Sequence, residues 1–493
     1  VDTSMPKSRR ARPIISRRSV WSSTISTRIG SSVIGRVLYC REQQADRGAD
    51  TGRGGHVDEA AALGGESEHL AQAQTAALAD VLGGEEGFGC ALGDVGSHAM
   101  ALVTDAEGDI ATLQRAVRIR VEPMLQCGGH QDAAAIDIYD KIKDAATVHR
   151  LTKACSSMAV HVLWDFSDEN LPARVVKSAS REGIRIGSIN PNLFQDQDFK
   201  LGSFGNPSPD IRKKAVDHCL KSIRIATECN SDNITFWFAD GTNYPGQDSI
   251  RLRKQLFESN LGKCHQSLSP GQKMLIEYKP FEPAFYHTDI ADWGMALCLA
   301  QKTGPQAKVL VDTGHHYASQ NIEQIVAWLL DEERLGGFHF NDRRYADDDL
   351  TLGSIDPYQV FRIFTEILAY HRETGTRPEI AYMVDQSHNL KPKIPAMIQT
   401  VTWAQELYAK AALVPWKALR INQIKGDIIS AEQCLQRAFM TDVTGALASW
   451  RKEKGLYPDP LEAYSKSGYE ASVTQERKQR RQDLGLNTKT SYA

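Results

Sequence analysis

The sequence predicts an α/β protein built on a (β/α)8 TIM barrel, with an atypical N-terminal segment before the barrel and a helical extension after it. Three observations predict this fold. From about residue 135, short apolar runs alternate with longer amphipathic stretches, as in a parallel sheet with helical crossovers. The runs are nearly continuous in hydrophobicity, which is typical of strands covered on both faces. No run leads into a glycine-rich nucleotide loop, which disfavours the alternative, a doubly wound open sheet.

The composition excludes several classes of protein. The chain has 493 residues and a formal net charge of -3, so its overall charge does not favour nucleic acid or an anionic membrane. No run approaches the roughly 20 apolar residues that a membrane span needs. The nine cysteines are scattered and form no CxxC pair, which predicts reduced thiols in a cytoplasmic protein.

Residues 1–130 differ from the rest of the chain. They hold three of its 38 aromatic residues, Trp21, Tyr39 and Phe88, and are rich in Ala, Gly, Arg and Ser. The arginine-rich stretch Lys7–Arg47 shares the bias of a mitochondrial presequence, but no amphipathic helix emerges and the bias runs on too long. A disordered basic arm is favoured, with an error in the assigned coding sequence as the other alternative. We expect no chemistry in this segment.

The barrel is predicted over residues 135–390. Seven strand-length runs are rich in β-branched and aromatic residues: Met158–Trp164, Arg185–Ile189, Asn233–Phe238, Lys273–Tyr278, Lys308–Val311, Gly337–Phe340 and Glu379–Val384. Helical patterns lie between them at Ile211–Cys229, Tyr286–Thr303, Ile322–Glu333 and Tyr358–Glu373. A closed barrel of this kind needs eight strands. The first strand is therefore expected to be improvised from Ala116–Glu122, or to be absent.

The segment 391–493 is predicted to form the helical extension, because it carries no strand pattern. Helices are expected at Val401–Leu413, Ala431–Phe439 and Val443–Lys454, packed around the barrel or against a partner subunit. The tail beyond Gln475 is polar and is expected to fray.

Residues of the kinds that bind metals lie at the ends of four successive predicted strands or shortly after them. They are Glu277, Asp312, His315, His339, Asp347, Asp349 and Asp385. The active sites of barrels form at the carboxyl ends of several strands at once, so these side chains are expected to meet.

Each of these residues alone has an ordinary explanation. A single Asp at a strand end is usually a helix cap or a surface charge, and a lone buried His usually hydrogen-bonds within the core. Four successive strands with such residues are different, because acids gathered at one barrel mouth are costly unless a cation lies among them. His339 also lies between Phe338 and Phe340, in a run expected to be buried. Carboxylates and imidazoles together favour Mn²⁺ or Mg²⁺ over a structural zinc.

Lys279 adds a cation to the predicted site. Residues two apart in a strand share a face, so its ammonium is expected beside the carboxylate of Glu277. A simple ion pair is one explanation. The other is functional, because a cation beside a metal suits stabilisation of a developing alkoxide on a sugar carbonyl.

The strand-end motifs resemble a known family. The segments AVHVLWD, TFWFADGTNYPGQ, IEYKPFEPAFYHTDIADWG, VDTGHHYASQNIE, LGGFHFNDRRYADDDL, IDPYQVF, MVDQSHN and DPLEAYSKSGY are similar to motifs of the L-rhamnose isomerases, particularly the broad-specificity bacterial branch. The resemblance runs from about Ile138 to Tyr469. It implies interconversion of L-rhamnose and L-rhamnulose by a metal-promoted hydride shift between C1 and C2. The family's first strand and its Trp- and Gly-rich loop are not found in residues 1–130.

The resemblance also implies cofactors, partners and residue roles. Two divalent ions are expected, with Mn²⁺ preferred and Co²⁺ or Mg²⁺ as substitutes, and no organic cofactor. The only expected partners are a sugar and other copies of the chain in a homotetramer, with no nucleic acid and no membrane. The implied ligands of the structural ion are Glu277, Asp312, His339 and Asp385, with Asp312 bridging, and those of the catalytic ion are His315, Asp347 and Asp349. Lys279, His315 and Asp347 would be catalytic, and His161, Trp237 and Lys279 would bind the substrate.

Three other functions stay open. The first is isomerisation of another aldose or ketose, because the motifs indicate the chemistry better than the sugar. The second is a metal-dependent endonuclease of the same fold, with three zinc ions and a basic groove; the acidic loop at residues 347–349 and the near-neutral charge argue against it. The third is a truncated barrel with weak or no catalysis.

Overall fold

The computed structural model describes residues 121–123, 132–282, 286–386 and 391–485. All of them lie within one of the chain's two compact units, Leu92–Ala493. The predictions for the atypical segment, and for most of the candidate strand Ala116–Glu122, therefore lie outside the described residues. Among the described residues, no helix combines the length and the hydrophobicity needed to cross a membrane. All six described cysteines are free thiols.

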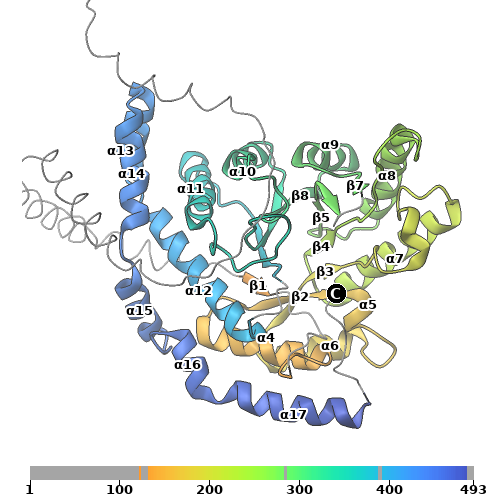
Figure 1. The fold of residues 1–493 in the computed structure, drawn as a ribbon, viewed down its shortest axis with the longest axis horizontal. Helices are drawn as coiled ribbons and strands as arrows, with labels where there is room; N and C mark the ends of the chain where they lie inside the picture. The colour runs from red at the N-terminus through yellow and green to blue at the C-terminus, as the bar shows by residue number, and fades with distance from the viewer. Residues whose placement is uncertain (1–120, 124–131, 283–285, 387–390, 486–493) are drawn as a thin grey trace, which may run out of the picture. The chain divides into compact units, whose positions relative to one another are not determined.

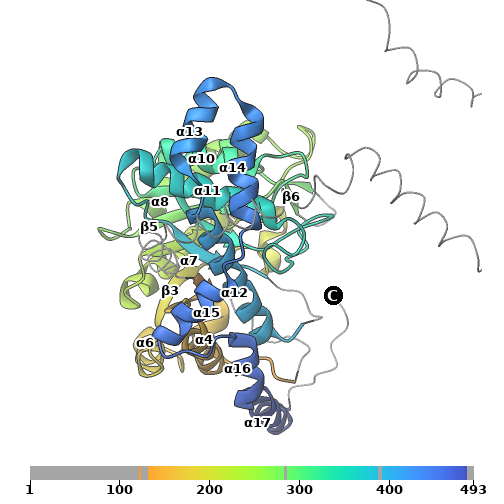
Figure 2. The ribbon, with the colours of Figure 1, turned by 90° about the vertical axis from the view of Figure 1, so that its left-hand side faces the viewer.

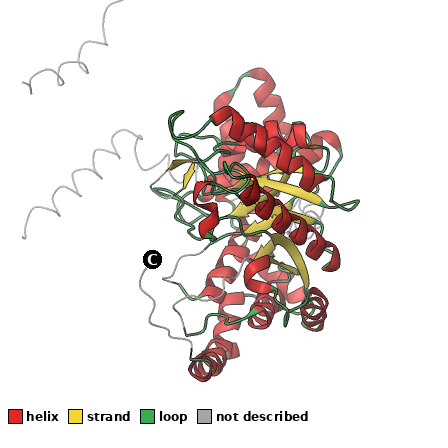
Figure 3. Ribbon diagram, turned by 90° about the vertical axis from the view of Figure 1, so that its right-hand side faces the viewer, coloured by secondary structure: helices red, strands yellow, loops and turns green. Residues whose placement is uncertain are grey.

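Eight strands of the described chain form one sheet in which every pairing is parallel. In pairing order they are β1 (Val121–Pro123), β10 (Ala381–Val384), β9 (Leu335–Phe340), β8 (Ala307–Asp312), β5 (Lys273–Glu277), β4 (Asn233–Phe236), β3 (Arg185–Asn190) and β2 (Ser157–His161). The two edge strands, β1 and β2, contact each other. The sheet thus curls into a nearly closed barrel with helices outside it (Figure 3). The predicted TIM-barrel fold is confirmed.

The first strand is short. β1 overlaps the last two residues of the candidate run Ala116–Glu122 and pairs with β10, Val121 opposite Tyr382 and Pro123 opposite Val384. Proline cannot donate to a sheet and is confined to edges and strand ends. Its place at the end of an edge strand agrees with that rule.

Helices surround the strands (Figure 1). They are α4 (Ile138–Thr152), α6 (Pro172–Arg181), α7 (Pro209–Glu228), α8 (Ile250–His265), α9 (Trp293–Thr303), α10 (Ile322–Asp331) and α11 (Pro357–Thr374), with a short helix α5 (Val162–Asp165) after β2 and a 3-10 turn η1 (Gln197–Leu201) after β3.

Two predicted boundaries are wrong. The run Met158–Trp164 is not one strand, because the chain turns into α5 after His161, where the Asp165 carboxylate accepts the His161 backbone N–H at 2.8 Å. The helix expected from Tyr286 begins only at Trp293, where Asp292 caps it. The residues before it form an antiparallel hairpin of β6 (Phe281–Glu282) and β7 (Tyr286–His287).

The core has two parts. Leu275, Leu310 and Met383, from β5, β8 and β10, form a small cluster that we call the apolar layer. Their sequence neighbours, such as Ile276 and Val309, belong instead to the large core that includes the surrounding helices. Because successive strand residues face opposite sides, the apolar layer lies inside the barrel. A Cβ on Gly336 of β9 would lie 2.5 Å from a methyl carbon of Leu275, so this interior has no space for a larger residue.

The chain after β10 is helical throughout its described part. It forms α12 (Lys393–Ala412), α13 (Trp416–Lys425), α14 (Ile428–Met440), α15 (Thr444–Glu453), α16 (Pro460–Ser467) and α17 (Tyr469–Asp483). In Figure 1, α13 to α16 lie on the left, the side that faces the viewer in Figure 2, and α17 runs along the bottom.

The prediction that the tail frays beyond Gln475 is wrong as far as Asp483. Arg477 of α17 is 1% exposed and binds both carboxylate oxygens of Asp144 on α4, at 2.7 and 2.9 Å. Arg480 binds Asp140 of α4 at 2.9 and 3.0 Å. Buried ion pairs therefore help to hold the last helix against α4, beside the apolar contacts of Val473 and Tyr469.

Candidate metal centre and active site

A charged layer lies directly beyond the apolar layer, toward the carboxyl ends of the strands. Two residues on from Leu275, Leu310 and Met383, on the same strand faces, stand Glu277, Asp312 and Asp385. His339 of β9 joins them, since it pairs with both Asp312 and Met383 in the sheet register. The alternation that builds the barrel interior thus also gathers the candidate ligands at its mouth.

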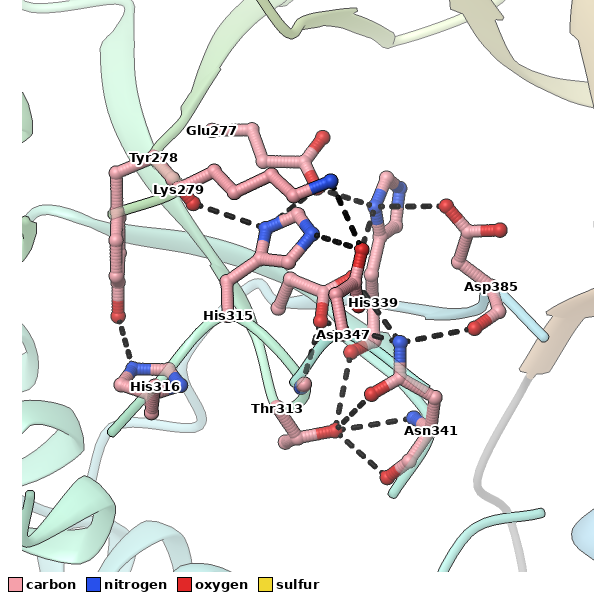
Figure 4. A network of polar contacts seen from close by, with 12 residues as sticks. Glu277, Tyr278, Lys279, Thr313, His315, His316, His339, Asn341, Asp347 and Asp385 are labelled. Atoms are coloured by element: carbon pink, nitrogen blue, oxygen red, sulfur yellow. Dashed lines mark hydrogen bonds and ion pairs between the residues drawn. The ribbon is translucent and has the colours of Figure 1, made fainter. Parts of the chain in front are cut away.

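His339 lies among three carboxylates. Its Nδ1 is 3.1 Å from Glu277 Oε1, 3.7 Å from Asp312 Oδ2 and 3.8 Å from Asp385 Oδ2, as Figure 4 shows for Glu277 and Asp385. The imidazole and the Glu277 and Asp312 carboxylates are almost fully buried. One face of the site is therefore a compact acidic cluster, in which only the Asp385 side chain, 26% exposed, reaches solvent.

His315 extends this cluster toward the acidic loop. Its Nδ1 lies 2.9 Å from the backbone oxygen of Tyr278 and 3.4 Å from Glu277 Oε1, and its Nε2 lies 3.2 Å from Asp347 Oδ2. The Lys279 ammonium is 2.9 Å from the same Asp347 oxygen. The lysine was expected beside Glu277; its ion pair is with Asp347, although its charge also helps to lower the pKa of Glu277.

The buried carboxylates and histidines of the site strongly shift one another's pKa values. Burial raises the pKa of Asp312 to about 7, and the neighbouring carboxylates Asp347 and Glu277 add to the effect. Burial would lower the pKa values of His315 and His339, but the carboxylates outweigh it and raise them to about 10 and about 9. The clustered buried carboxylates therefore favour positively charged groups beside them.

The donor atoms fit divalent cations. Two sets of ligand atoms each lie within 4.8 Å of one another: Glu277, Asp312 and His315, and Asp312, His339 and Asp385. Asp312 belongs to both sets, which agrees with the bridging role expected for it. Within the described chain, His339 Nε2 and Asp347 Oδ1 are also buried without a hydrogen-bond partner, an arrangement that is costly unless another group serves them. A set that mixes carboxylate oxygens with imidazole nitrogens suits a divalent cation.

The acidic loop contributes its three aspartates unequally. Asp347 faces His315 and Lys279 in Figure 4. Asp348 accepts hydrogen bonds from the backbone N–H groups of Arg344 and Tyr345 and so shapes the loop itself. Asp349 has a left-handed backbone with φ of 47° and lies outside both ligand sets. Five of the seven expected ligands make up the two sets, Asp347 joins them through its contact with His315, and the expected role of Asp349 as a ligand stays a prediction.

An aromatic wall borders the charged cluster. The Lys279 ammonium lies 5.2 Å from the centre of the Trp237 ring, and Trp237 meets Phe194 edge to face at 4.9 Å. Phe194 leads to Trp164 at 6.4 Å, and Trp164 lies 4.2 Å from the ring of His161. Both residues expected to bind substrate, His161 and Trp237, therefore belong to one continuous surface beside the candidate ligands.

His161 is held as a neutral imidazole. Burial, with the charges of Lys141 and His339, lowers its pKa to about 3. Its Nδ1 and the indole N–H of Trp237 are buried and have no partner among the described residues. Both are polar groups at the wall that a bound ligand could satisfy.

The sequence motifs contained residues that we did not single out. Trp164 and Phe194 of the wall follow β2 and β3, so the rule that barrel sites form at strand ends applies to them too. Asn341 and Thr313 hydrogen-bond around Asp312. No spacing signal distinguishes them from ordinary loop residues, since their importance depends on contacts between strands.

Fold and site define the class: this is a TIM barrel with a candidate divalent-metal centre at the carboxyl ends of its strands. The family described as xylose isomerase-like TIM barrel matches residues 150–367. A probable sugar isomerase of Mesorhizobium japonicum is 38% identical over 346 residues, covering 69% of this chain and 80% of the relative. A probable sugar isomerase of Rhizobium meliloti is 37% identical over the same length, with the same coverage. The chain belongs to the xylose isomerase-like TIM barrel family.

One solved structure is similar to this chain at low sequence identity. A xylose isomerase domain protein from Alicyclobacillus acidocaldarius is 16% identical and superposes with a TM-score of 0.42, covering 56% of this chain and 95% of that chain.

Proposed function

We propose that this protein is a metal-dependent aldose–ketose isomerase whose preferred substrate pair is L-rhamnose and L-rhamnulose. The observation that carries the proposal is the meeting of six metal-binding side chains, a lysine and an aromatic wall at one barrel mouth. The relatives named as probable sugar isomerases support the reaction class. The motif resemblance to the L-rhamnose isomerases supports the choice of sugar.

Two divalent cations, preferably Mn²⁺, fit the ligand sets. His339 and Asp385 would hold the ion that orients sugar hydroxyls, and His315, with Asp347 beside it, would hold the catalytic ion. Asp312 serves both sets, and Glu277 lies within 3.4 Å of both histidines. Bound there, the cations would supply Lewis-acid polarisation of the sugar oxygens and promote a hydride shift between C1 and C2.

Lys279 acts at the substrate carbonyl. Lys279 is only 8% exposed, and its ammonium is held by Asp347 Oδ2 at 2.9 Å and lies over the face of Trp237. From that position it donates a hydrogen bond to the carbonyl oxygen and stabilises the negative charge that develops there. Such a donor is most effective in a site that excludes water, because its charge is little screened.

The wall binds the sugar. Trp237 and Phe194 offer an apolar surface to the C–H face of the sugar and to a terminal methyl group. The neutral imidazole of His161 accepts or donates one hydrogen bond to a sugar oxygen. A deoxy sugar suits such a wall, because fewer hydroxyl groups are then buried without a partner. We further propose a homotetramer, on the resemblance alone.

A panel of sugars tests the substrate. Purified protein with Mn²⁺ is assayed for ketose formation from L-rhamnose and from other aldoses, including D-xylose, and kcat/KM is compared. We expect the highest value with L-rhamnose. A higher value with another aldose would replace the sugar and keep the reaction class, and no ketose from any aldose would indicate a barrel without this catalysis.

Two histidine variants test the division of the site. His339→Ala should weaken substrate affinity and lower stability, since it removes a ligand of the ion that orients the sugar. His315→Ala should lower kcat more than it raises KM, because the catalytic ion acts mainly in the transition state. If both variants changed substrate affinity alone and to the same degree, the division would be incorrect.

A further inference from the structure

Asn341 occupies a central place behind the candidate metal centre. It is 1% exposed and follows β9 directly. In the sheet, β9 lies between β8, which ends in Asp312, and β10, which is followed by Asp385. A single side chain at this position can therefore reach the ligand-bearing ends of both neighbouring strands.

The amide of Asn341 makes this connection. Its Nδ2 donates to Asp312 Oδ1 at 3.1 Å, lies 3.3 Å from Asp312 Oδ2, and donates to the backbone oxygen of Asp385 at 2.9 Å (Figure 4). Because a carboxylate and a carbonyl can only accept, the NH₂ end of the amide must face them. Both of its hydrogens are then used, one toward each neighbouring strand.

Two neighbours hold the amide in this orientation. The Thr313 hydroxyl lies 3.2 Å from Asn341 Oδ1 and 2.8 Å from the Asn341 backbone oxygen, and it accepts the Asn341 N–H at 3.0 Å. Gly314 leaves the space, since a Cβ there would lie 2.7 Å from Asn341 Oδ1 and 2.9 Å from Asp347 Oδ1. The backbone N–H of Gly314 also donates to Asp312 Oδ1 at 2.7 Å.

We infer that Asn341 is a positioning residue that fixes the rotation of the Asp312 carboxylate, and thereby lets one carboxylate serve both ligand sets. The inference rests on the proposed function, because it takes the two ligand sets as cation sites. Without the amide donor, Asp312 keeps the Gly314 N–H on Oδ1 but is free to turn Oδ2 away from His339. Groups that orient a ligand in this way typically account for about 10–100-fold in metal affinity.

The test compares Mn²⁺ binding by calorimetry in three variants of the full chain. Asn341→Leu keeps the size of the side chain and removes the donor. Asn260→Leu is the matched control, since Asn260 is also buried and donates to a backbone carbonyl, that of Phe204 at 3.1 Å, away from the site. Thr313→Val loosens the amide and leaves every candidate ligand in place.

The expected result is an Mn²⁺ affinity about 10–100-fold weaker in Asn341→Leu, measurably weaker in Thr313→Val, and unchanged in Asn260→Leu. Unchanged affinity in a folded Asn341→Leu protein would overturn the inference, as would equal losses in the Asn341 and Asn260 variants. If Asn341→Leu does not fold, Thr313→Val decides, and wild-type affinity in that variant overturns the inference. A wild-type protein that binds no Mn²⁺ refutes the proposed function itself, a result distinct from these.

Discussion

The buried ion pair between Arg477 of α17 and Asp144 of α4 is expected to contribute several kcal/mol to the free energy of unfolding. Arg477→Met removes a buried guanidinium that donates twice to the Asp144 carboxylate. Among its described hydrogen-bond partners, Asp144 then keeps only the hydroxyl of Tyr469, at 2.8 Å. Removing one partner of a buried ion pair costs about 3–5 kcal/mol, because the other charge stays buried. Domains are stable by only about 5–15 kcal/mol, so the loss is large.

Urea unfolding measures this loss. With a slope of about 3 kcal/mol per molar urea, the upper value for small proteins, a cost of 3–5 kcal/mol lowers the midpoint by roughly 1–1.7 M. The double variant with Asp144→Asn should recover much of the difference, since no charge is then buried alone. If α17 detaches by itself before the barrel unfolds, a protease should instead cut within α17 under native conditions.

The control is Lys478→Met on the same helix, whose side chain is 60% exposed and 3.9 Å from Asp132. Exposed pairs contribute about 0–1 kcal/mol, so its midpoint should barely move. An Arg477→Met protein with the wild-type midpoint and an uncut α17 would show that the buried ion pairs do not hold the tail.

Three further predictions concern the site and the pH dependence of stability. Chelation of divalent cations should lower the thermal unfolding midpoint. Mn²⁺ at 100 times its Kd should then raise the free energy of unfolding by about 2.7 kcal/mol per site. A midpoint that does not change on chelation would argue against a metal centre. Lys279→Met should lower kcat by about 10²–10³-fold and leave Mn²⁺ affinity unchanged, as for the loss of one preorganised donor. If steady-state kinetics showed a change in KM alone, Lys279 would not stabilise the transition state. Burial lowers the pKa of His218, whose ring accepts the Asn192 N–H at 2.9 Å, so the unfolded chain binds this proton more readily. The free energy of unfolding should therefore fall as the pH drops below about 6.5, and His218 should contribute a loss of no more than about 1.4 kcal/mol at pH 5.5. His218→Gln, which accepts without titrating, should lack that part of the decrease, and identical pH dependence in urea unfolding would contradict the assignment.

Much of the fold was predictable because the barrel strands are buried on both faces. β8 and β9 are apolar segments of the sequence, and both are almost fully buried in the structure. The rule that barrel sites form at the carboxyl ends of strands also predicted that the candidate ligands meet at the barrel mouth.

Other features depend on partners far away in the sequence. Arg477 and Asp144 are 333 residues apart, and a polar helix held by such pairs has the same local pattern as a frayed tail. The start of α9 had a local signal that we did not use, since the Asp292 carboxylate accepts the Met295 N–H at 2.8 Å as a helix cap.

The site was predictable by residue type and less so by arrangement. Asp347 and Asp349 have the same chemistry and nearly the same position in the chain. The course of the loop, with its left-handed residue at Asp349, brings Asp347 to 3.2 Å from His315, and this contact could not be read from the sequence. Glu277 likewise approaches both histidines, which no one-dimensional spacing could show.

The most direct test of the central claim is the metal dependence of isomerisation. Protein stripped of divalent cations, with the residual content verified, is incubated with L-rhamnose, and L-rhamnulose is measured as Mn²⁺ is added back. We expect the metal-free protein to form no ketose, and we expect full isomerase activity once about two ions are bound per chain. Full isomerase activity in the verified metal-free protein would contradict this claim, as would the absence of activity with any aldose when both sites are filled.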